Sequence, residues 1–257
     1  MDIRDGERLD EIGFGGLKLI QKPQDFCYGV DAVLLADFAA SIAKKKLAII
    51  DLGTGTGIIP VILSHKTSAE KICGVEIQQD SYERAIRNVR LNGLDDRLEM
   101  ICCNVKNLDE SLKGCFDTAT SNPPYMEQGS AIVNDISAKT IARHEVYAGL
   151  EDFIAAAAFL LEERGEFFMV HRPSRLVDIM YYSRQYRLEP KTVRFVCPKS
   201  GQAANIVLIH CIKNAGRRGC ALPVGRVFGQ RKRGRCGAGC LRRLNERVPA
   251  AAQGGRK

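Results

Sequence analysis

Strand-like apolar runs alternate with helix-length segments through the middle of this chain, and this alternation constrains the fold more than any other feature. A strand followed by a helix, rather than by a tight turn, requires a crossover connection, which makes neighbouring strands parallel. A parallel sheet is stable only when helices cover both of its faces. The sequence therefore predicts an α/β fold with a doubly wound, mainly parallel sheet.

The apolar periodicity sets where the elements are expected. Strands are expected at residues 47–51, 71–76, 98–102, 116–121 and 165–170, and helices at residues 31–43, 58–65, 81–92, 150–163 and 174–186. No helix-length segment separates two further strands, 192–197 and 205–212. We therefore expect these last two strands to form an antiparallel pair.

The chain divides into three parts by composition. Residues 1–45 are interpreted as an N-terminal strand and helix extension packed on the core, and residues 46–213 as the main domain. Residues 213–257 hold thirteen Lys and Arg but one acidic residue, whereas the chain as a whole is only +8. We interpret residues 214–257 as a basic, Gly- and Arg-rich tail that is disordered or non-native. The alternative is an arm that binds RNA phosphates.

Nothing in the composition indicates secretion, a membrane span or a metal site. The longest apolar runs are far shorter than the roughly 20 residues that cross a bilayer, and the charged N-terminus does not resemble a signal peptide. Most of the ten cysteines are scattered, and the CxxxC pair Cys236 and Cys240 has no histidine nearby to complete a zinc site. We expect a cytoplasmic protein with reduced thiols, no metal and no obligate protein partner.

A glycine-rich turn follows the first strand of the main domain. Asp51 ends the strand, and glycines follow at positions 53, 55 and 57. Glycines allow a tight turn and a close approach of the backbone to a ligand at the carboxyl end of a strand. The spacing is GxGxG, whereas a dinucleotide site needs GxGxxG, so an NAD-linked enzyme is disfavoured. A plain tight turn in an α/β core is the other interpretation.

An acidic residue ends the second strand of this domain. Glu76 can accept hydrogen bonds from both ribose hydroxyls of an adenosyl group. The turn holds no basic residue, so a phosphate is not the expected ligand. Together with Asp51, the acid at position 76 favours a cofactor that carries an adenosyl group and an amine, such as S-adenosylmethionine.

The sequence Asn122-Pro123-Pro124-Tyr125 directly follows the strand at residues 116–121. Two prolines fix the backbone and remove two N–H donors, which makes the loop stiff. The Asn122 side-chain oxygen and the Pro123 carbonyl can both accept hydrogen bonds from an exocyclic amine. Tyr125 and Pro124 offer surfaces for binding a planar base, which can stack on the tyrosine ring.

This loop predicts transfer of a methyl group to a planar nitrogen. The lone pair of an aromatic amine is delocalised into its ring, and two acceptors on its hydrogens favour a pyramidal nitrogen with an available lone pair. Positioning then supplies much of the rate. We expect Asn122, Pro123 and Tyr125 to be catalytic. A rigid turn without chemistry is the plainer interpretation, and carbon methylation is disfavoured because a tyrosine stands where a cysteine nucleophile is expected.

These motifs resemble class I S-adenosylmethionine-dependent methyltransferases with an Asn-Pro-Pro-Tyr motif. The segment from Phe26 to Ala36 and the segment Ala142-Arg143-His144-Glu145 make the chain most similar to the bacterial family that N6-methylates an adenosine beside the anticodon of valine tRNA. The resemblance covers about residues 7–212. It implies a Rossmann-like sheet and a tRNA substrate bound by an RNA-binding surface.

The resemblance also implies roles for residues that the motifs alone do not assign. The cofactor-binding set it implies is Asp51, Gly53, Gly55, Gly57, Glu76, Asn104 and Asp31. Asn104 stands where the family usually has an aspartate contacting the adenine. Asp31 could instead cap its helix. Tyr28, Pro124, Arg143 and His144 are expected to bind the substrate, although a histidine near a helix start is often structural.

Two functions other than tRNA methylation stay open at this point. Enzymes that methylate a glutamine amide in peptide release factors share the Asn-Pro-Pro-Tyr motif, although they usually carry an extra N-terminal helical domain, for which 46 residues are too few. A non-catalytic RNA-binding protein with a vestigial cofactor fold is the second alternative. The sequence best predicts an S-adenosylmethionine-dependent RNA adenine-N6 methyltransferase that modifies tRNA.

Overall fold

A computed structural model describes residues 3–25, 27–44, 47–125, 148–217 and 226–227 of the 257-residue chain. Its main feature is an eight-stranded sheet with the strand order β10-β8-β9-β7-β6-β3-β4-β5. The strands are β3 (Ala48–Leu52), β4 (Lys71–Glu76), β5 (Leu98–Cys102), β6 (Phe116–Ser121), β7 (Leu161–His171), β8 (Leu188–Cys197), β9 (Ile206–Lys213) and β10 (Arg226–Val227).

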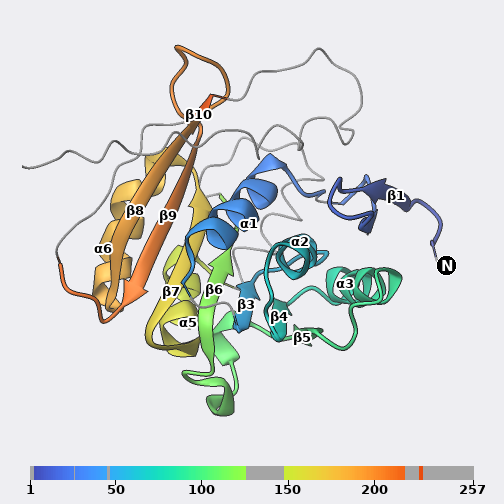
Figure 1. The fold of residues 1–257 in the computed structure, drawn as a ribbon, viewed down its shortest axis with the longest axis horizontal. Coiled ribbons are helices and arrows are strands. Elements are labelled where there is room, and N and C mark those ends of the chain that lie inside the picture. The colour runs from blue at the N-terminus through green and yellow to red at the C-terminus, as the bar shows by residue number, and fades with distance from the viewer. Residues whose placement is uncertain (1–2, 26, 45–46, 126–147, 218–225, 228–257) are drawn as a thin grey trace, which may run out of the picture.

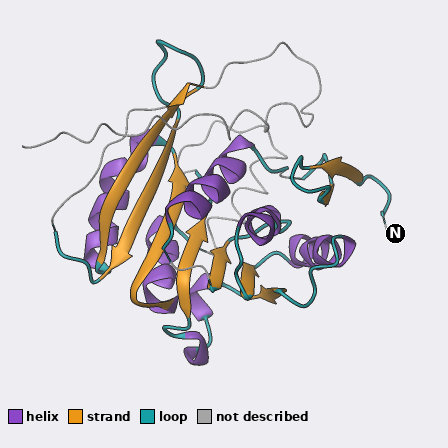
Figure 2. Ribbon diagram, in the orientation of Figure 1, coloured by secondary structure: helices purple, strands orange, loops and turns teal. Residues whose placement is uncertain are grey.

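The directions of the strands confirm the predicted fold class. Strands β5, β4, β3, β6 and β7 run parallel to one another. Strand β9 lies between β7 and β8 and runs antiparallel to both, so the C-terminal pair is antiparallel as predicted. In Figure 2 the arrowheads of β8 and β9 point in opposite directions. The sheet is Rossmann-like, with the order reversing between β3 and β6.

Helices cover both faces of the sheet (Figure 1). The helices are α1 (Val30–Ile42), α2 (Ile58–Lys66), α3 (Gln79–Leu91), α5 (Leu150–Leu160) and α6 (Leu176–Gln185), with short 3₁₀ turns η1 (Val105–Asn107), η2 (Glu110–Leu112) and η3 (Pro173–Arg175). Helices α1 and α2 pack together on one face, and α5 and α6 pack on the other.

Three predicted boundaries were wrong in the second half of the sheet, and one of them is the start of β7, which begins at Leu161 rather than at residue 165. The helix expected over residues 150–163 ends at Leu160, because Leu161 is extended, fully buried and paired with Phe116 of β6. Strand β8 begins at Leu188, four residues before the expected start. It contains Pro190, which is tolerated because the pairing with β9 shifts register there.

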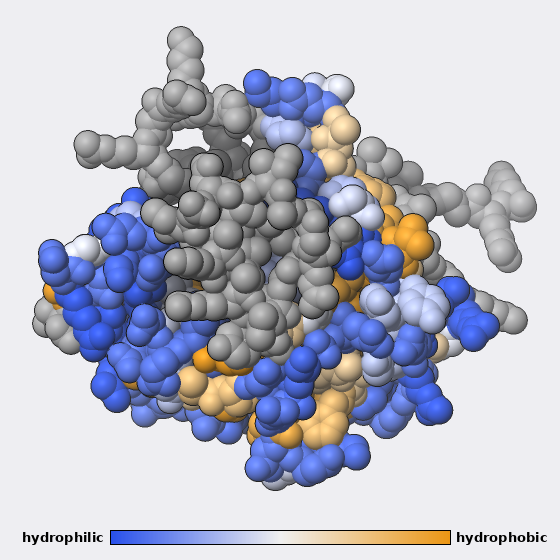
Figure 3. Space-filling view, turned by 180° about the vertical axis from the view of Figure 1, so that it is seen from behind, coloured by the Kyte–Doolittle hydropathy of each residue, from blue (hydrophilic) through white to orange (hydrophobic). Residues whose placement is uncertain are grey.

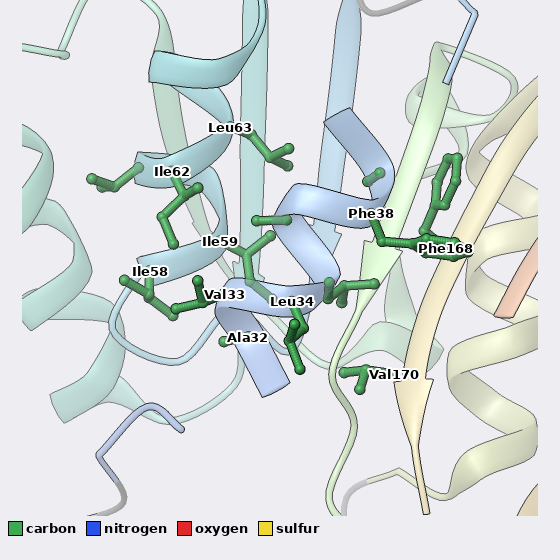
Figure 4. Close-up of a cluster of buried hydrophobic side chains, with 14 of the residues drawn as sticks. Ala32, Val33, Leu34, Phe38, Ile58, Ile59, Ile62, Leu63, Phe168 and Val170 are labelled. Atoms are coloured by element: carbon green, nitrogen blue, oxygen red, sulfur yellow. The ribbon is translucent and has the colours of Figure 1, made fainter. Parts of the chain in front are cut away.

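Each strand sends alternate side chains into two separate apolar cores. Ile49 of β3 and Phe168 of β7 belong to the core under α1 and α2, whereas their neighbours along the chain, Ile50 and Phe167, belong to the core under α5 and α6. Figure 4 shows the first core, where Phe38 of α1 meets Phe168 edge to face, with ring centroids 5.7 Å apart. This alternation holds the sheet between two helical layers.

An N-terminal hairpin is docked onto α3 rather than onto the main sheet. Strands β1 (Arg8–Glu11) and β2 (Lys18–Gln21) form it. Asn88 and Asn92, one turn apart on α3, bond the free edge of β2 through their amides, accepting from Ile20 N at 2.6 Å and Lys18 N at 2.9 Å. Asn88 also donates to the Thr56 carbonyl, so the hairpin is linked to the glycine turn.

A buried ion cluster fixes the chain just before this hairpin. The Glu7 carboxylate, whose side chain is only 4% exposed, pairs with Arg84 at 3.3 Å and with Arg87 at 2.5 Å on α3. Arg84 also pairs with Asp25 at 2.8 Å. The hydrogen bonds and charge of Arg87, together with bonds from Arg4 and Arg84, lower the pKa of Glu7 to about 2, against the opposing effect of burial.

Seen from behind, the coloured part of the molecular surface is mostly hydrophilic and has some apolar patches (Figure 3). No helix in the described part of the chain is long and apolar enough to span a membrane.

The proposed division of the chain stays a prediction. Helix α1, which we assigned to the N-terminal extension, packs in the first core together with α2 and the sheet. Of the basic tail, residues 214–217 and the two-residue strand β10, which pairs with the end of β8, are described. The remaining residues of the tail lie outside the described ranges.

We predict that Glu7→Gln destabilises the protein. The folded pKa of about 2 lies below the ordinary value of 4.5, so Glu7 contributes stability that is present above pH 4.5 and is lost as pH falls toward 2. Allowing for solvent screening, the loss at pH 7 should be about 2 kcal/mol in a urea titration.

The matched control is Glu83→Gln, which removes an exposed pair with Arg4 and should change stability little. At pH 2 the Glu7→Gln variant and the wild type should differ much less than at pH 7. An equal difference at both pH values would show that the ionised carboxylate contributes nothing to folding.

Candidate active site

The register of three adjacent strands builds the site. Leu52 of β3 pairs with Val75 of β4 on one side and with Ser121 of β6 on the other, so β3 and β6 end level and β4 ends one residue later, at Glu76. The residues that follow this row are therefore at the same edge of the sheet. They include the glycine turn, the acid at position 76 and Asn122. The predicted cofactor and catalytic motifs are brought together at the switch point of the sheet.

The glycine turn has the backbone conformation that its sequence predicts. Gly53, Gly55 and Gly57 have φ angles of 70°, 58° and 83°, in the left-handed region that disfavours other residues. A Cβ on Gly53 would lie 3.0 Å from the Phe153 ring, whereas a Cβ on Gly55 would meet nothing within 4 Å. The backbone N–H groups of Gly53 and Thr54 donate to the Val75 carbonyl. The turn is thus held by β4 through the Val75 carbonyl, and it has open space beside Gly55.

Asp51 lies directly beneath this turn and is fully buried. Its Oδ1 accepts a 2.6 Å hydrogen bond from the Thr120 hydroxyl, while its buried Oδ2 has no well-formed hydrogen bond among the described residues. Burial raises the pKa of Asp51 to about 7, the negative charge of Glu76 adds to this, and the Thr120 and Thr54 hydroxyls oppose it. A cationic group bound beside the glycine turn would stabilise the ionised form of this carboxylate.

Glu76 ends β4 and orients its carboxylate with backbone donors. Its Oε2 accepts from Gly55 N at 2.9 Å and its Oε1 from Gln78 N at 2.8 Å. Each carboxylate oxygen has a second acceptor direction, so two hydroxyl donors can still be bound. The residue is only 5% exposed.

Asn104 follows the next strand, β5, two residues after its end. It is partly buried, and its side-chain oxygen accepts from Lys106 N at 3.0 Å, which caps the 3₁₀ turn η1. The strand end pairs with Glu76 through Cys102, so Asn104 lies near the same edge of the sheet. Its contact with an adenine ring stays a prediction.

The Asn-Pro-Pro-Tyr loop extends this edge from β6. Pro123 is buried, whereas Pro124 is exposed. The Tyr125 hydroxyl oxygen lies 2.6 Å from Asn122 Oδ1 and 2.7 Å from Asp31 Oδ2. Asp31 belongs to the first turn of α1 and accepts from Ala32 N at 3.0 Å. The loop is therefore tied to α1, a helix separated from it by more than eighty residues in the sequence.

The ring of Tyr125 is contacted by two residues that the sequence analysis did not assign. The His171 ring lies 4.9 Å away at an angle of 58°, and the Arg172 guanidinium lies 4.9 Å above the tyrosine ring. Arg172 also donates to the Asn205 carbonyl at 3.1 Å. A base that stacks on this tyrosine must use its other face or displace the arginine. The sheet topology could have indicated these contacts, because β7 pairs with β6 and continues beyond the end of β6 to His171.

The histidine beside the tyrosine is neutral at physiological pH. Burial, with the charge of Arg175, lowers the pKa of His171 to about 4. Its Nδ1 accepts from Arg172 N at 2.8 Å, so the ring proton is on Nε2. The lowered pKa keeps the His171 ring neutral, and the hydrogen bond at Nδ1 fixes its orientation beside Tyr125.

The remaining predicted residues have different outcomes. Tyr28 lies just before α1, is partly buried against the first core, and its N–H donates to the Gln21 side chain at 3.1 Å. Arg143 and His144 lie outside the described residues. Among the described residues, no group of three or more His, Cys, Asp or Glu side chains is placed to hold a metal ion.

Comparison with known proteins places the chain in a family. The model of the "Methyltransferase small domain" family matches residues 30–180. The chain belongs to this family. The matched range contains the glycine turn, the acid at position 76 and the Asn-Pro-Pro-Tyr loop, which confirms the resemblance that these motifs carry.

Three curated relatives are named tRNA1(Val) (adenine(37)-N6)-methyltransferase. The Flavobacterium johnsoniae protein is 34% identical over 53% of this chain and 57% of its own length, and a Porphyromonas gingivalis protein is 32% identical over 62% and 64%. The Mannheimia succiniciproducens protein is 30% identical over 70% and 72%. The chain thus matches less than two thirds of the length of the first two relatives.

Solved structures show the same fold at lower sequence identity. A predicted O-methyltransferase from Agrobacterium tumefaciens has a TM-score of 0.61 and 21% identity over 77% of this chain and 87% of its own. A geranyl diphosphate C-methyltransferase from Streptomyces coelicolor has a TM-score of 0.54 and 15% identity over 70% and 76%. These similarities establish the methyltransferase fold.

We predict that Asp51 makes the ligand-free protein less stable as pH rises. Its pKa is raised from 3.8 to about 7, so its stabilising effect is complete below pH 3.8 and is lost as pH rises to about 7. Asp51→Asn removes the ionisation and should narrow the difference in melting temperature between pH 5 and pH 8. Asp96→Asn, at an exposed position, should behave like the wild type. An unchanged pH dependence in Asp51→Asn would contradict this assignment.

Proposed function

We propose that this protein is an S-adenosylmethionine-dependent N-methyltransferase that transfers a methyl group to the exocyclic N6 of an adenosine in tRNA. The observation that carries the proposal is the register of β3, β4 and β6, which sets Asn122, the glycine turn and Glu76 at one edge of the sheet. A site for an adenosyl cofactor and a site for a planar amine therefore share one edge of the sheet. By the resemblance, the target lies in the anticodon-loop region of valine tRNA, and the protein acts in the cytoplasm.

The residues of the glycine turn fit this cofactor. Glu76 can accept from ribose hydroxyls, because its two backbone donors leave further acceptor directions on both oxygens. Asp51 holds a buried oxygen without a well-formed hydrogen bond and has a raised pKa, which suits a cationic amine nearby. Gly55 leaves open space where a side chain would stand. When bound, S-adenosylmethionine supplies an electrophilic methyl group on a sulfonium. Structural neighbours solved with S-adenosyl-L-homocysteine support this choice.

The Asn-Pro-Pro-Tyr loop performs the positioning step. The Asn122 side-chain oxygen and the Pro123 carbonyl accept the two hydrogens of the target amine, which directs its lone pair toward the methyl group. With the cofactor bound, its methyl group would be supplied to this nitrogen, and the methylated amine would release one proton to water. The loop is stiff because of its two prolines, so little rearrangement is needed at the moment of transfer.

The surroundings of Tyr125 support a base flipped out of a nucleic acid. A base can stack on its ring, which contributes about 1–3 kcal/mol, and the target must leave its stack to reach Asn122. The exposed Arg172 holds a positive charge beside that ring, where a phosphate of the same nucleotide would approach. The names of the curated relatives support tRNA as the polymer.

The test is methyl transfer from radiolabelled S-adenosylmethionine to unmodified bulk tRNA, followed by nucleoside analysis. The proposal predicts N6-methyladenosine as the labelled product. Transfer to a peptide release factor, with none to tRNA, would replace the proposal by glutamine-amide methylation. Cofactor binding without transfer to either polymer would favour a non-catalytic RNA-binding protein.

We predict that Asn122→Ala lowers the rate of transfer at least about 100-fold, because one of two preorganised acceptors is lost. Binding of S-adenosylhomocysteine, measured by calorimetry, should be retained. Asn205→Ala, at an exposed position whose backbone carbonyl is kept, is the control and should retain the wild-type rate. Full activity of Asn122→Ala would exclude the catalytic role of this loop.

A further inference from the structure

The Tyr125 hydroxyl at the catalytic loop makes two short polar contacts but has one hydrogen. The Tyr125 hydroxyl is within hydrogen-bond distance of Asp31 Oδ2, at 2.7 Å, and of Asn122 Oδ1, at 2.6 Å. A phenol has a single hydrogen, so it can donate to one of these oxygens and not to both. The second short contact requires a hydrogen from the other partner.

The Tyr125 hydroxyl donates its hydrogen bond to the Asp31 carboxylate. Burial and the neighbouring Asp31 carboxylate raise the pKa of Tyr125, so the phenol keeps its proton. Hydrogen bonds to a carboxylate are stronger than bonds to a neutral amide oxygen. The position of Asp31 in the first turn of α1 also favours its negative charge, because the helix N-terminus is positive.

The amide of Asn122 must then donate to the phenol oxygen. A half turn about its Cβ–Cγ bond exchanges the oxygen and nitrogen of the amide, which have nearly the same shape. The nitrogen then donates to Tyr125, and both hydroxyl contacts are satisfied. The side-chain oxygen of Asn122 is left on the side away from Tyr125, free to accept from an incoming amine.

We propose that Asp31 is a positioning residue that orients the Asn122 amide through the Tyr125 hydroxyl. This inference rests on the proposed function, because it assigns Asn122 the task of accepting a hydrogen from the target amine. It also changes the role of Asp31, which the resemblance placed among the cofactor contacts. The tyrosine then has two tasks, a ring that receives the base and a hydroxyl that fixes the neighbouring amide.

The anchor for this arrangement is rigid. Asp31 Oδ1 accepts from Ala32 N at 3.0 Å, which leaves Oδ2 directed to the tyrosine. The helix that carries Asp31 is held in the first core by Ala32, Val33 and Leu34, all buried (Figure 4). The Asn-Pro-Pro-Tyr loop is thus fixed to the helical layer as well as to β6.

Loss of the Asp31 charge should turn the Asn122 side-chain amide around, so that its oxygen and nitrogen exchange places. Without a carboxylate acceptor, the phenol donates to the Asn122 oxygen instead, and the amide nitrogen turns toward the target. Two donors would then face each other across the site. The expected effect is therefore on the chemical step, with substrate binding largely kept.

The test compares Asp31→Asn, Tyr125→Phe and the double variant in the full-length protein. Each single variant should lower kcat at least about 10-fold, as expected for a lost charge-assisted hydrogen bond. KM for S-adenosylmethionine and for tRNA should stay within about twofold. The double variant should be no slower than either single variant, because both remove the same interaction. Asp37→Asn, on the same helix and paired with Lys66, is the control and should be unaffected.

A second readout does not depend on activity. The side-chain amide signals of Asn122 in an ¹⁵N-labelled protein, identified by their absence in Asn122→Ala, should shift in both Asp31→Asn and Tyr125→Phe but not in Asp37→Asn. Multiplicative losses in the double variant, unchanged amide signals, or a loss confined to KM for S-adenosylmethionine would overturn the proposal. A wild type inactive on tRNA, with shifted amide signals in the variants, would refute the tRNA function and leave the amide assignment standing.

Discussion

The shared register of three parallel strands is the constraint on which the site depends. Leu52, Val75 and Ser121 form one row across β3, β4 and β6, and the chain leaves the sheet after Leu52 and Ser121 and, one residue beyond this row, after Glu76. Three loops distant in the sequence therefore begin within one residue of the same height. A shift of one residue in any strand would reverse which side chains face the cores, and the apolar packing on both faces opposes such a shift.

This register explains why the fold and much of the site could be predicted from sequence. The strands that end at Leu52, Glu76 and Ser121 can be recognised from the length and pattern of their apolar residues alone, without tertiary information. The left-handed φ angles at Gly53, Gly55 and Gly57 follow from a turn that only glycine adopts easily. The misplaced end of α5 has a local cause, because Leu161 suits a helix and a buried strand equally well.

The contacts that the sequence could not predict all cross between distant segments. Arg172 and His171 lie against Tyr125 because β7 extends beyond β6, and pairing lengths are not visible in either strand alone. The hydrogen bond from Tyr125 to Asp31 joins the start of α1 to a loop 94 residues later in the sequence. The Glu7 cluster likewise depends on two arginines of α3 facing an N-terminal segment without regular periodicity.

The central claim is that one edge of the sheet holds both the adenosyl cofactor and the amine to be methylated. A crystal structure of the full-length protein with S-adenosyl-L-homocysteine tests it most directly. The claim predicts ribose hydroxyls bound by Glu76, the amino group near Asp51, and the sulfur facing Asn122 and Pro123. A ligand whose sulfur points away from the Asn-Pro-Pro-Tyr loop, or one bound away from the glycine turn, would contradict it.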